Sequence, residues 1–124
     1  MERNPGNGLI RDWAWNISGK STAPASIAAT GFALTAYGVG VELGWLNRSQ
    51  AIQMVKRILL FLRDEAPTEH GFFYHFLTME KGARVNGSEL SPIDTALAVA
   101  GVLFVSEYFQ DEEIQTIARD IWER

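Results

Sequence analysis

The sequence predicts an all-α protein built from two αα-hairpins, with a small β-hairpin between the two helix pairs. Two stretches, 24–43 and 92–109, are rich in small apolar residues and have the length of helices. Each is followed by a stretch, 48–65 or 112–123, in which apolar residues recur every three or four positions, as in an amphipathic helix. A small helix followed by an amphipathic one therefore occurs twice, which is typical of stacked αα-hairpins.

Composition supports one compact domain and excludes several kinds of partner. The chain has 124 residues, of which 47% are hydrophobic, so one core can form. Its net charge is −4 and no basic stripe occurs, so we expect no nucleic-acid partner. The absence of cysteine excludes disulfides and thiolate metal sites. No run is expected to reach the ~18 apolar residues of a membrane span, and the first residues lack an export-signal pattern.

Residues 1–23 predict an N-terminal loop, because they are rich in glycine, asparagine and serine. The loop carries Trp13 and Trp15, which we expect to pack on the body of the protein. With Arg11 and Asp12 they form a polar and aromatic cluster of the kind that contacts sugars, since aromatic faces stack on sugar C–H groups. The alternative is a loop that the tryptophans pin to the core.

The first helix pair is predicted over 24–65. Pro24 suits the first helical turn, where its missing N–H group has no partner in any case. The alanines and glycines of this helix indicate close packing against other helices. Asn47 or Ser49 can cap the amphipathic helix that follows.

Residues 70–90 interrupt the helical pattern and predict a β-hairpin with Gly82 in its turn. The second helix pair then occupies 91–124. Ser91 is a strong N-cap, and it is followed by a proline at the first helical position and an acidic residue at the third, which both suit a helix start. The last helix can begin after Asp111. In such arrays the small helices line the inside, and two hairpins leave a side of each without a partner.

Three motifs resemble the bacterial glucoamylase-like family, which includes endo-β-1,2-glucanases and a domain of cyclic β-1,2-glucan synthases. They are "ASIAATGFALTAYGVGVELGWL", "GFFYHFLTMEKG" and "SELSPIDTALAVAG" with "EYF". The similarity runs from about Gly8 to Arg124. It implies an (α/α)6 toroid of six inner and six outer helices, of which this chain would supply about four. It also implies hydrolysis or binding of a β-glucan, and a periplasmic or exported location.

The sequence departs from the family pattern in two respects. Pro92 stands where a serine or threonine usually follows the first serine of the third motif. Family members also continue for roughly twice this length again. The chain is therefore expected to be one unit, 1–124, that resembles the first third of a glucoamylase-like domain. It would be either part of a longer repeat protein or a unit completed by self-association through its inner helices.

Glu89 and Asp94 are the candidate catalytic residues. Glycoside hydrolysis uses two carboxylates, one as acid and one as base or nucleophile. Asp94 also has a structural explanation, because a carboxylate in the first turn of a helix stabilises its free N–H groups. Glu89 has no such structural explanation. The resemblance to the family strengthens the case that both residues are functional. They lie close together in sequence, so we expect the opposing carboxylate to come from elsewhere.

His75 is a candidate sugar contact, with Tyr74 and Phe72 as stacking platforms, or else a histidine bonded within the core. His70 is the only other histidine, so no metal site is predicted, and no nucleotide motif or cofactor site occurs. The leading hypothesis is a glycoside-hydrolase-like chain that acts on or binds a β-glucan. The alternative is a non-catalytic helical module that binds carbohydrate or self-associates. A terpenoid-cyclase-like or lyase toroid is a third candidate, and the lack of a DDxxD run counts against the metal-dependent cyclases.

Overall fold

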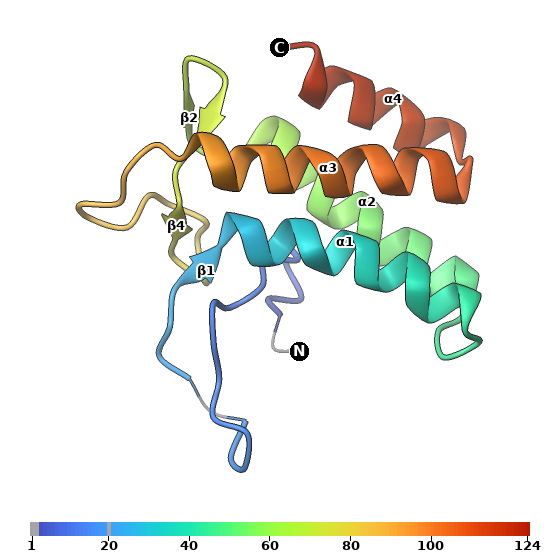
Figure 1. Cartoon of the computed structure of the whole chain (residues 1–124), viewed down its shortest axis with the longest axis horizontal. Helices are drawn as coiled ribbons and strands as arrows, with labels where there is room; N and C mark the ends of the chain where they lie inside the picture. Colours follow the sequence, from blue (N-terminus) through green and yellow to red (C-terminus); the bar gives the residue numbers. More distant parts are fainter. Residues whose placement is uncertain (1–2, 20) are drawn as a thin grey trace.

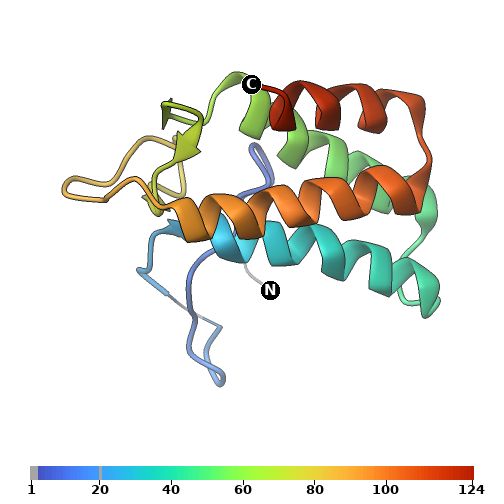
Figure 2. The ribbon, with the colours of Figure 1, turned by 45° about the horizontal axis from the view of Figure 1, so that its top comes forward.

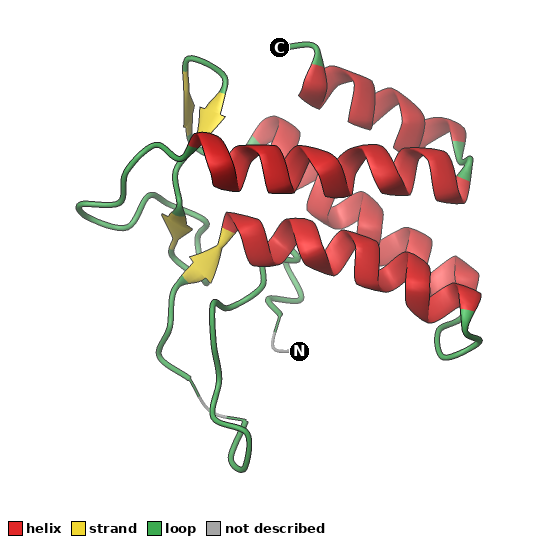
Figure 3. Cartoon of the chain, in the orientation of Figure 1, coloured by secondary structure: helices red, strands yellow, loops and turns green. Residues whose placement is uncertain are grey.

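The computed structural model describes residues 3–19 and 21–124, and it confirms the predicted fold class. Helices alternate with loops, and short strands lie between the two helix pairs and just before the first helix (Figures 1 and 3). The described helices are α1 (Ile27–Glu42), α2 (Arg48–Asp64), α3 (Pro92–Phe109) and α4 (Glu112–Trp122).

The two small apolar helices, α1 and α3, run alongside each other and make the most extensive contact in the chain (Figures 1 and 2). The amphipathic helices α2 and α4 contact each other and pack on α1 and α3 respectively. Lys56 joins α2 to α4 through an ion pair of 2.6 Å between its Nζ and Glu113 Oε2. The core lies between these helices, as the predicted pairing of small and amphipathic helices requires.

Gly31 and Gly101 explain why α1 and α3 are rich in small residues. A Cβ atom built on Gly101 would lie 2.3 Å from the backbone oxygen of Gly31. A Cβ atom on Gly31 would lie 2.6 Å from the backbone oxygen of Leu97. The two backbones therefore touch at this crossing, and only glycine fits there. This contact confirms that the alanine and glycine pattern serves helix packing.

The helix starts agree with the sequence except at α1. Pro24 lies before this helix and not in its first turn, because Ser26 pairs as a strand residue with Phe76 and then caps Ile27–Glu42. Asn47 caps α2, and Ser91 and Asp111 cap α3 and α4, as predicted.

The predicted β-hairpin lies earlier in the chain than the sequence indicated. Thr68 pairs with Phe73, and the turn between the strands consists of His70 and Gly71. Both turn residues have positive φ, which is the backbone of the tightest two-residue hairpin turns. Gly82 lies in the turn of the loop that follows, where Leu77 and Arg84 form an isolated antiparallel bridge. The described strands are β1 (Ala25–Ser26), β2 (Thr68–Glu69), β3 (Phe72–Phe73) and β4 (Phe76–Leu77); β1 pairs with β4, and β2 with β3.

Contrary to the expectation from sequence, α3 has the length and composition of a membrane span. Its 18 residues have a mean hydropathy of 1.3. Its close packing on α1, and its contacts with α4, give the same composition a role in the core of this fold.

Candidate functional site

The residues before α1 and α3 form the same backbone frame, and this frame positions the candidate site. At α1, the Ser26 N–H group donates to the carbonyl of Ile10 at 3.0 Å, and the Ile10 N–H group donates to the Thr30 hydroxyl at 3.3 Å. The Ser26 hydroxyl caps the helix by accepting from the Ala29 N–H group at 3.2 Å. A serine and a threonine four residues apart thus tie the preceding segment to the helix.

At α3 the same contacts recur. The Ser91 N–H group donates to the carbonyl of Phe73 at 3.0 Å, and the Phe73 N–H group donates to the Thr95 hydroxyl at 2.9 Å. The Ser91 hydroxyl accepts from the Asp94 N–H group at 3.2 Å. Two residues beyond Phe73, the His75 N–H group donates to the carbonyl of Glu89 at 2.9 Å. The frame therefore holds His75, Glu89 and Asp94 at the N-terminal end of α3.

His75 lies between the two candidate catalytic carboxylates. Its Nδ1 atom is 2.7 Å from Glu89 Oε1, and its Nε2 atom is 3.6 Å from Asp94 Oδ1. The other carboxylate oxygen of Asp94 accepts a hydrogen bond from the Ser91 hydroxyl. The structure thus brings together three residues that the sequence selected separately, and we call His75, Glu89 and Asp94 the carboxylate–histidine cluster.

The two carboxylates of this cluster differ in their access to solvent. The Glu89 side chain is 64% exposed, whereas the Asp94 side chain is only 11% exposed. Glu89 can therefore meet a ligand, and Asp94 is held by Ser91 and faces His75. The His75 imidazole lies between the two carboxylates, so they do not face each other across an open space.

The pKa of Glu89 is lowered. The main cause is a hydrogen bond from its own backbone N–H group, and the next is the hydrogen bond with the His75 ring. Both contacts stabilise the ionised form. Glu89 is thus a carboxylate at neutral pH, which suits a base or an acceptor of hydroxyl hydrogen bonds and does not suit a proton donor.

Of the predicted stacking platforms, Phe72 and Tyr74 differ in their freedom to meet a sugar. Phe72 is 41% exposed. Tyr74 donates its hydroxyl hydrogen to Glu69 at 2.9 Å, and the Arg84 guanidinium lies over its ring at 4.3 Å. The hydrogen bond to Glu69 also raises the pKa of Tyr74. Sequence analysis did not single out Arg84, and only the folded loop reveals that it covers one face of Tyr74.

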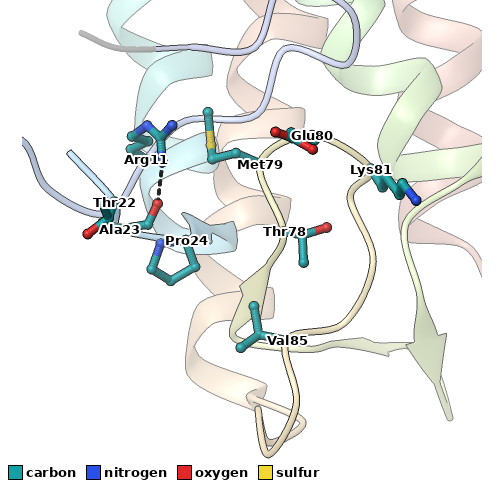
Figure 4. Close-up of a pocket in the computed structure, with 9 residues that line it drawn as sticks. All are labelled: Arg11, Thr22, Ala23, Pro24, Thr78, Met79, Glu80, Lys81 and Val85. Atoms are coloured by element: carbon teal, nitrogen blue, oxygen red, sulfur yellow. Dashed lines mark hydrogen bonds between the residues drawn. The ribbon is translucent and has the colours of Figure 1, made fainter. Parts of the chain in front are cut away.

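The N-terminal loop does not bury its tryptophans, so that prediction was wrong. Trp15 is 66% exposed, and the two rings meet edge to face at 5.7 Å. Arg11 lies at a cavity of about 520 Å³ and donates to the carbonyl of Ala23 at 2.6 Å (Figure 4). None of the nine residues that line this cavity belongs to the carboxylate–histidine cluster. The cavity beside Arg11 is therefore formed by other residues than that cluster.

Within residues 3–19 and 21–124, no group of three or more histidine, cysteine, aspartate or glutamate side chains is arranged to hold a metal ion. In the cluster, Glu89 Oε1 contacts the His75 ring, and the other oxygen of Asp94 accepts from the Ser91 hydroxyl. A carboxylate and an imidazole in contact can form hydrogen bonds and transfer protons.

Comparison with known proteins gives similarities over nearly the whole chain. No protein-family model matches it. The chain is 31% identical over 115 residues to an exo β-1,2-glucooligosaccharide sophorohydrolase (non-reducing end) of Parabacteroides distasonis. That match covers 87% of this chain and 15% of the relative, so the chain spans about a seventh of the curated relative's length.

Solved structures share the fold. An endo-β-1,2-glucanase from Chitinophaga pinensis, solved with sophorotriose and glucose, has a TM-score of 0.81 at 25% identity, over 98% of this chain and 31% of that one. A β-1,2-glucanase from Parabacteroides distasonis has a TM-score of 0.78 at 27% identity, over 96% of this chain and 17% of that one. A candidate glucoamylase from Bacteroides uniformis has a TM-score of 0.79 at 23% identity, over 98% of this chain and 30% of that one. These similarities confirm the predicted resemblance to part of the glucoamylase-like toroids.

Proposed function

We propose, from this resemblance to glucoamylase-like proteins, that the chain forms one wall of a β-glucan site in a glycoside hydrolase domain. In this proposal the Glu89 carboxylate meets the sugar, and Asp94 orients the site from within the start of α3. The relatives are named for β-1,2-linked glucans and sophorooligosaccharides, so a β-1,2-glucan is the first ligand to test.

The observation that carries the proposal is that the frame before α3 holds a carboxylate–histidine cluster and the matching frame before α1 does not. Ala29 occupies the position of Asp94, and Pro24 provides the carbonyl that Glu89 provides at α3. The frame therefore forms without Asp94 and Glu89 in its first copy. Their presence in the second copy calls for a reason other than the helix start, and sugar chemistry supplies one.

Geometry limits the part that this chain plays in catalysis. A glycosidase needs carboxylates on the two sides of the scissile bond, at least ~5 Å apart. The His75 ring lies between Glu89 and Asp94, so a scissile bond cannot sit between these two carboxylates. We infer that Glu89 serves as base or hydroxyl acceptor, since it is ionised, and that the proton donor comes from another segment of the complete site.

The test compares the wild type with Glu89→Gln, and with Glu107→Gln as a matched control. Glu107 is exposed near the other end of α3, so its loss leaves the cluster intact. Reducing-sugar release from β-1,2-glucan and calorimetric binding of sophorotriose are measured for each protein. Glu89→Gln is expected to lower turnover by about 100-fold or more, or to weaken binding where no turnover occurs, and Glu107→Gln to change neither. A wild type that neither hydrolyses nor binds these glucans contradicts the proposal.

Self-association is the second candidate function, and the exposed apolar residues of α1 favour it. Phe32 is 62% exposed, and Val39 and Leu43 continue the same face, with Trp45 just beyond the helix. Such a stripe is expected to pack against another helical surface. Solution mass over a range of concentrations decides this alternative. A monomer at all of them would exclude it.

A further inference from the structure

His75 is fixed more firmly than any other member of the carboxylate–histidine cluster. Its N–H group donates to the carbonyl of Glu89, and its carbonyl accepts from the N–H group of Ile27, the first residue of α1, at 3.2 Å. Its ring stacks on Phe76 with centroids 3.7 Å apart. The residue therefore joins the starts of α1 and α3, and its ring has little freedom to turn.

Both ring nitrogens of His75 face protein carboxylates. An ionised carboxylate only accepts hydrogen bonds, so the 2.7 Å contact with Glu89 places a proton on Nδ1. Nε2 faces Asp94 Oδ1 at 3.6 Å, and the other oxygen of Asp94 is occupied by the Ser91 hydroxyl. Nδ1 is within hydrogen-bond distance of Glu89, and Nε2 lies beside Asp94 at a longer distance. This arrangement fits the second of the two interpretations of His75, a histidine bonded within the protein.

We propose that His75 is a positioning residue: its Nδ1–H group holds the Glu89 carboxylate in one orientation, and its ring lies between that carboxylate and the Asp94–Ser91 start of α3. The catalytic meaning of this role rests on the proposed function, but the role itself is a property of the folded chain. In many sites a carboxylate orients a histidine by accepting a hydrogen bond from its ring. Here the fixed ring of His75 orients the exposed carboxylate of Glu89.

Backbone contacts favour a rigid support over an incidental pairing. The carbonyl of Glu89 is held by the His75 N–H group, so both the backbone and the side chain of Glu89 contact the same residue. A residue whose backbone and side chain are both held before binding loses less conformational entropy when a ligand binds it. The Glu89 side chain is 64% exposed, and its contact with His75 still fixes its orientation. An acceptor of a sugar hydroxyl needs both properties.

The experiment is nuclear magnetic resonance on the full chain, and it needs no ligand. In the wild type, the ring ¹⁵N shifts of neutral His75 are expected to report a proton on Nδ1. The substitution His75→Phe keeps a ring on Phe76 and removes the donor. The carboxyl pKa of Glu89, followed by its side-chain ¹³C shift, is then expected to rise toward the ordinary range, because one of the two main contacts that lower it is lost.

His70→Phe is the matched control. His70 is the only other histidine, its side chain is 83% exposed, and it lies in the hairpin turn beside Glu69. This substitution is expected to leave the titration of Glu89 unchanged. His75→Gln, whose amide can still donate to Glu89, is expected to restore part of the lowered pKa, which a purely steric role for the ring would not predict.

Two results would overturn the proposal: a proton on Nε2 in neutral wild-type His75, or a Glu89 titration that is the same in His75→Phe and in the wild type. The wild-type measurement decides the matter even if His75→Phe does not fold. Absence of glucan binding would remove the proposed function and leave these titrations unaffected. A glucan complex that forms equally well with His75→Phe, alongside an unchanged Glu89 titration, would instead remove the positioning role alone.

Discussion

The starts of α1 and α3 use the same backbone frame but carry different side chains. At both, a serine hydroxyl accepts from the N–H group three residues later at 3.2 Å. The receiving residue is Ala29 in the first helix and Asp94 in the second. The contrast teaches that the serine is enough to begin such a helix, so the carboxylate of Asp94 is an addition to a start that is already complete.

The segments before the helices repeat this contrast. The N–H group of Asp12 donates to the carbonyl of Pro24 at 2.9 Å, just as His75 donates to Glu89. Asp12 is exposed in the N-terminal loop, whereas the His75 ring stacks on Phe76 and contacts two carboxylates. The second copy of the frame therefore places a histidine between two carboxylates, where the first copy carries Asp12, Pro24 and Ala29.

The largest expected effect comes from breaking the helix contact that makes the two copies neighbours. Gly101→Leu would place a side chain where even a Cβ atom lies 2.3 Å from the Gly31 oxygen. The backbone of α1 cannot move aside as a flexible side chain could. We therefore expect a loss of about 3 kcal/mol in the free energy of unfolding. Urea denaturation measures it. Ala100→Leu, at an exposed neighbouring position of α3, is the control and is expected to change stability little. Equal stability of both variants would show that α1 and α3 do not dock at these glycines.

Removing the threonine of each frame tests whether the two copies are equivalent. Thr95→Val leaves the N–H group of Phe73 without its 2.9 Å acceptor, and Thr30→Val does the same to Ile10. Both threonines are buried, so each substitution is expected to cost about 1–3 kcal/mol. Thr30→Val should cost the more, because Thr30 is fully buried and its hydroxyl also donates to the Ser26 carbonyl at 2.8 Å. The comparison of the two frames fails if either substitution leaves the urea midpoint unchanged.

A smaller effect is expected from the cap of α3. Ser91→Ala removes the hydroxyl that accepts from the Asp94 N–H group and should cost about 1 kcal/mol. Asp94→Ala recreates the residue found at Ala29 and should cost less, although it removes the partner of Ser91 and His75. Thermal unfolding ranks the two. A larger loss for Asp94→Ala would mean that this carboxylate is needed for the fold and would weaken its case as a functional residue.

Much of the fold could be predicted because its signals are local. Helix periodicity and the caps Asn47, Ser91 and Asp111 depend on residues within a turn of one another, and the structure confirms them. The start of α1 was misplaced because Ser26 is recruited by Phe76, fifty residues away in the chain. The hairpin was misplaced for a different reason: glycines with positive φ occur in both loops, and the sequence does not say which of them carries paired strands.

The site shows the same division between local and distant information. Glu89 and Asp94 were selected by residue type and position, but nothing local shows that His75 stands between them. That contact depends on the pairing of the segment after the hairpin with the segment before α3, through the Tyr74–Leu90 bridge and the hydrogen bond from the His75 N–H group to the Glu89 carbonyl. The exposure of Trp15 was missed for the complementary reason, since a tryptophan-rich loop predicts burial only when a surface is available to receive it.

The smallest effect concerns the pH dependence of stability at Glu89. Its pKa is lower in the folded chain, so it contributes stability above its ordinary pKa, and this contribution is lost as the pH falls through the folded value. The wild type is therefore expected to exceed Glu89→Gln in stability near neutral pH, and the difference should shrink on acidification. Urea denaturation at several pH values measures it, with Glu107→Gln as the control for the loss of an exposed α3 carboxylate. A stability difference that stays constant down to low pH would mean that the contacts of Glu89 do not depend on its charge. The residues before α3 would then differ from those before α1 in shape and not in electrostatics.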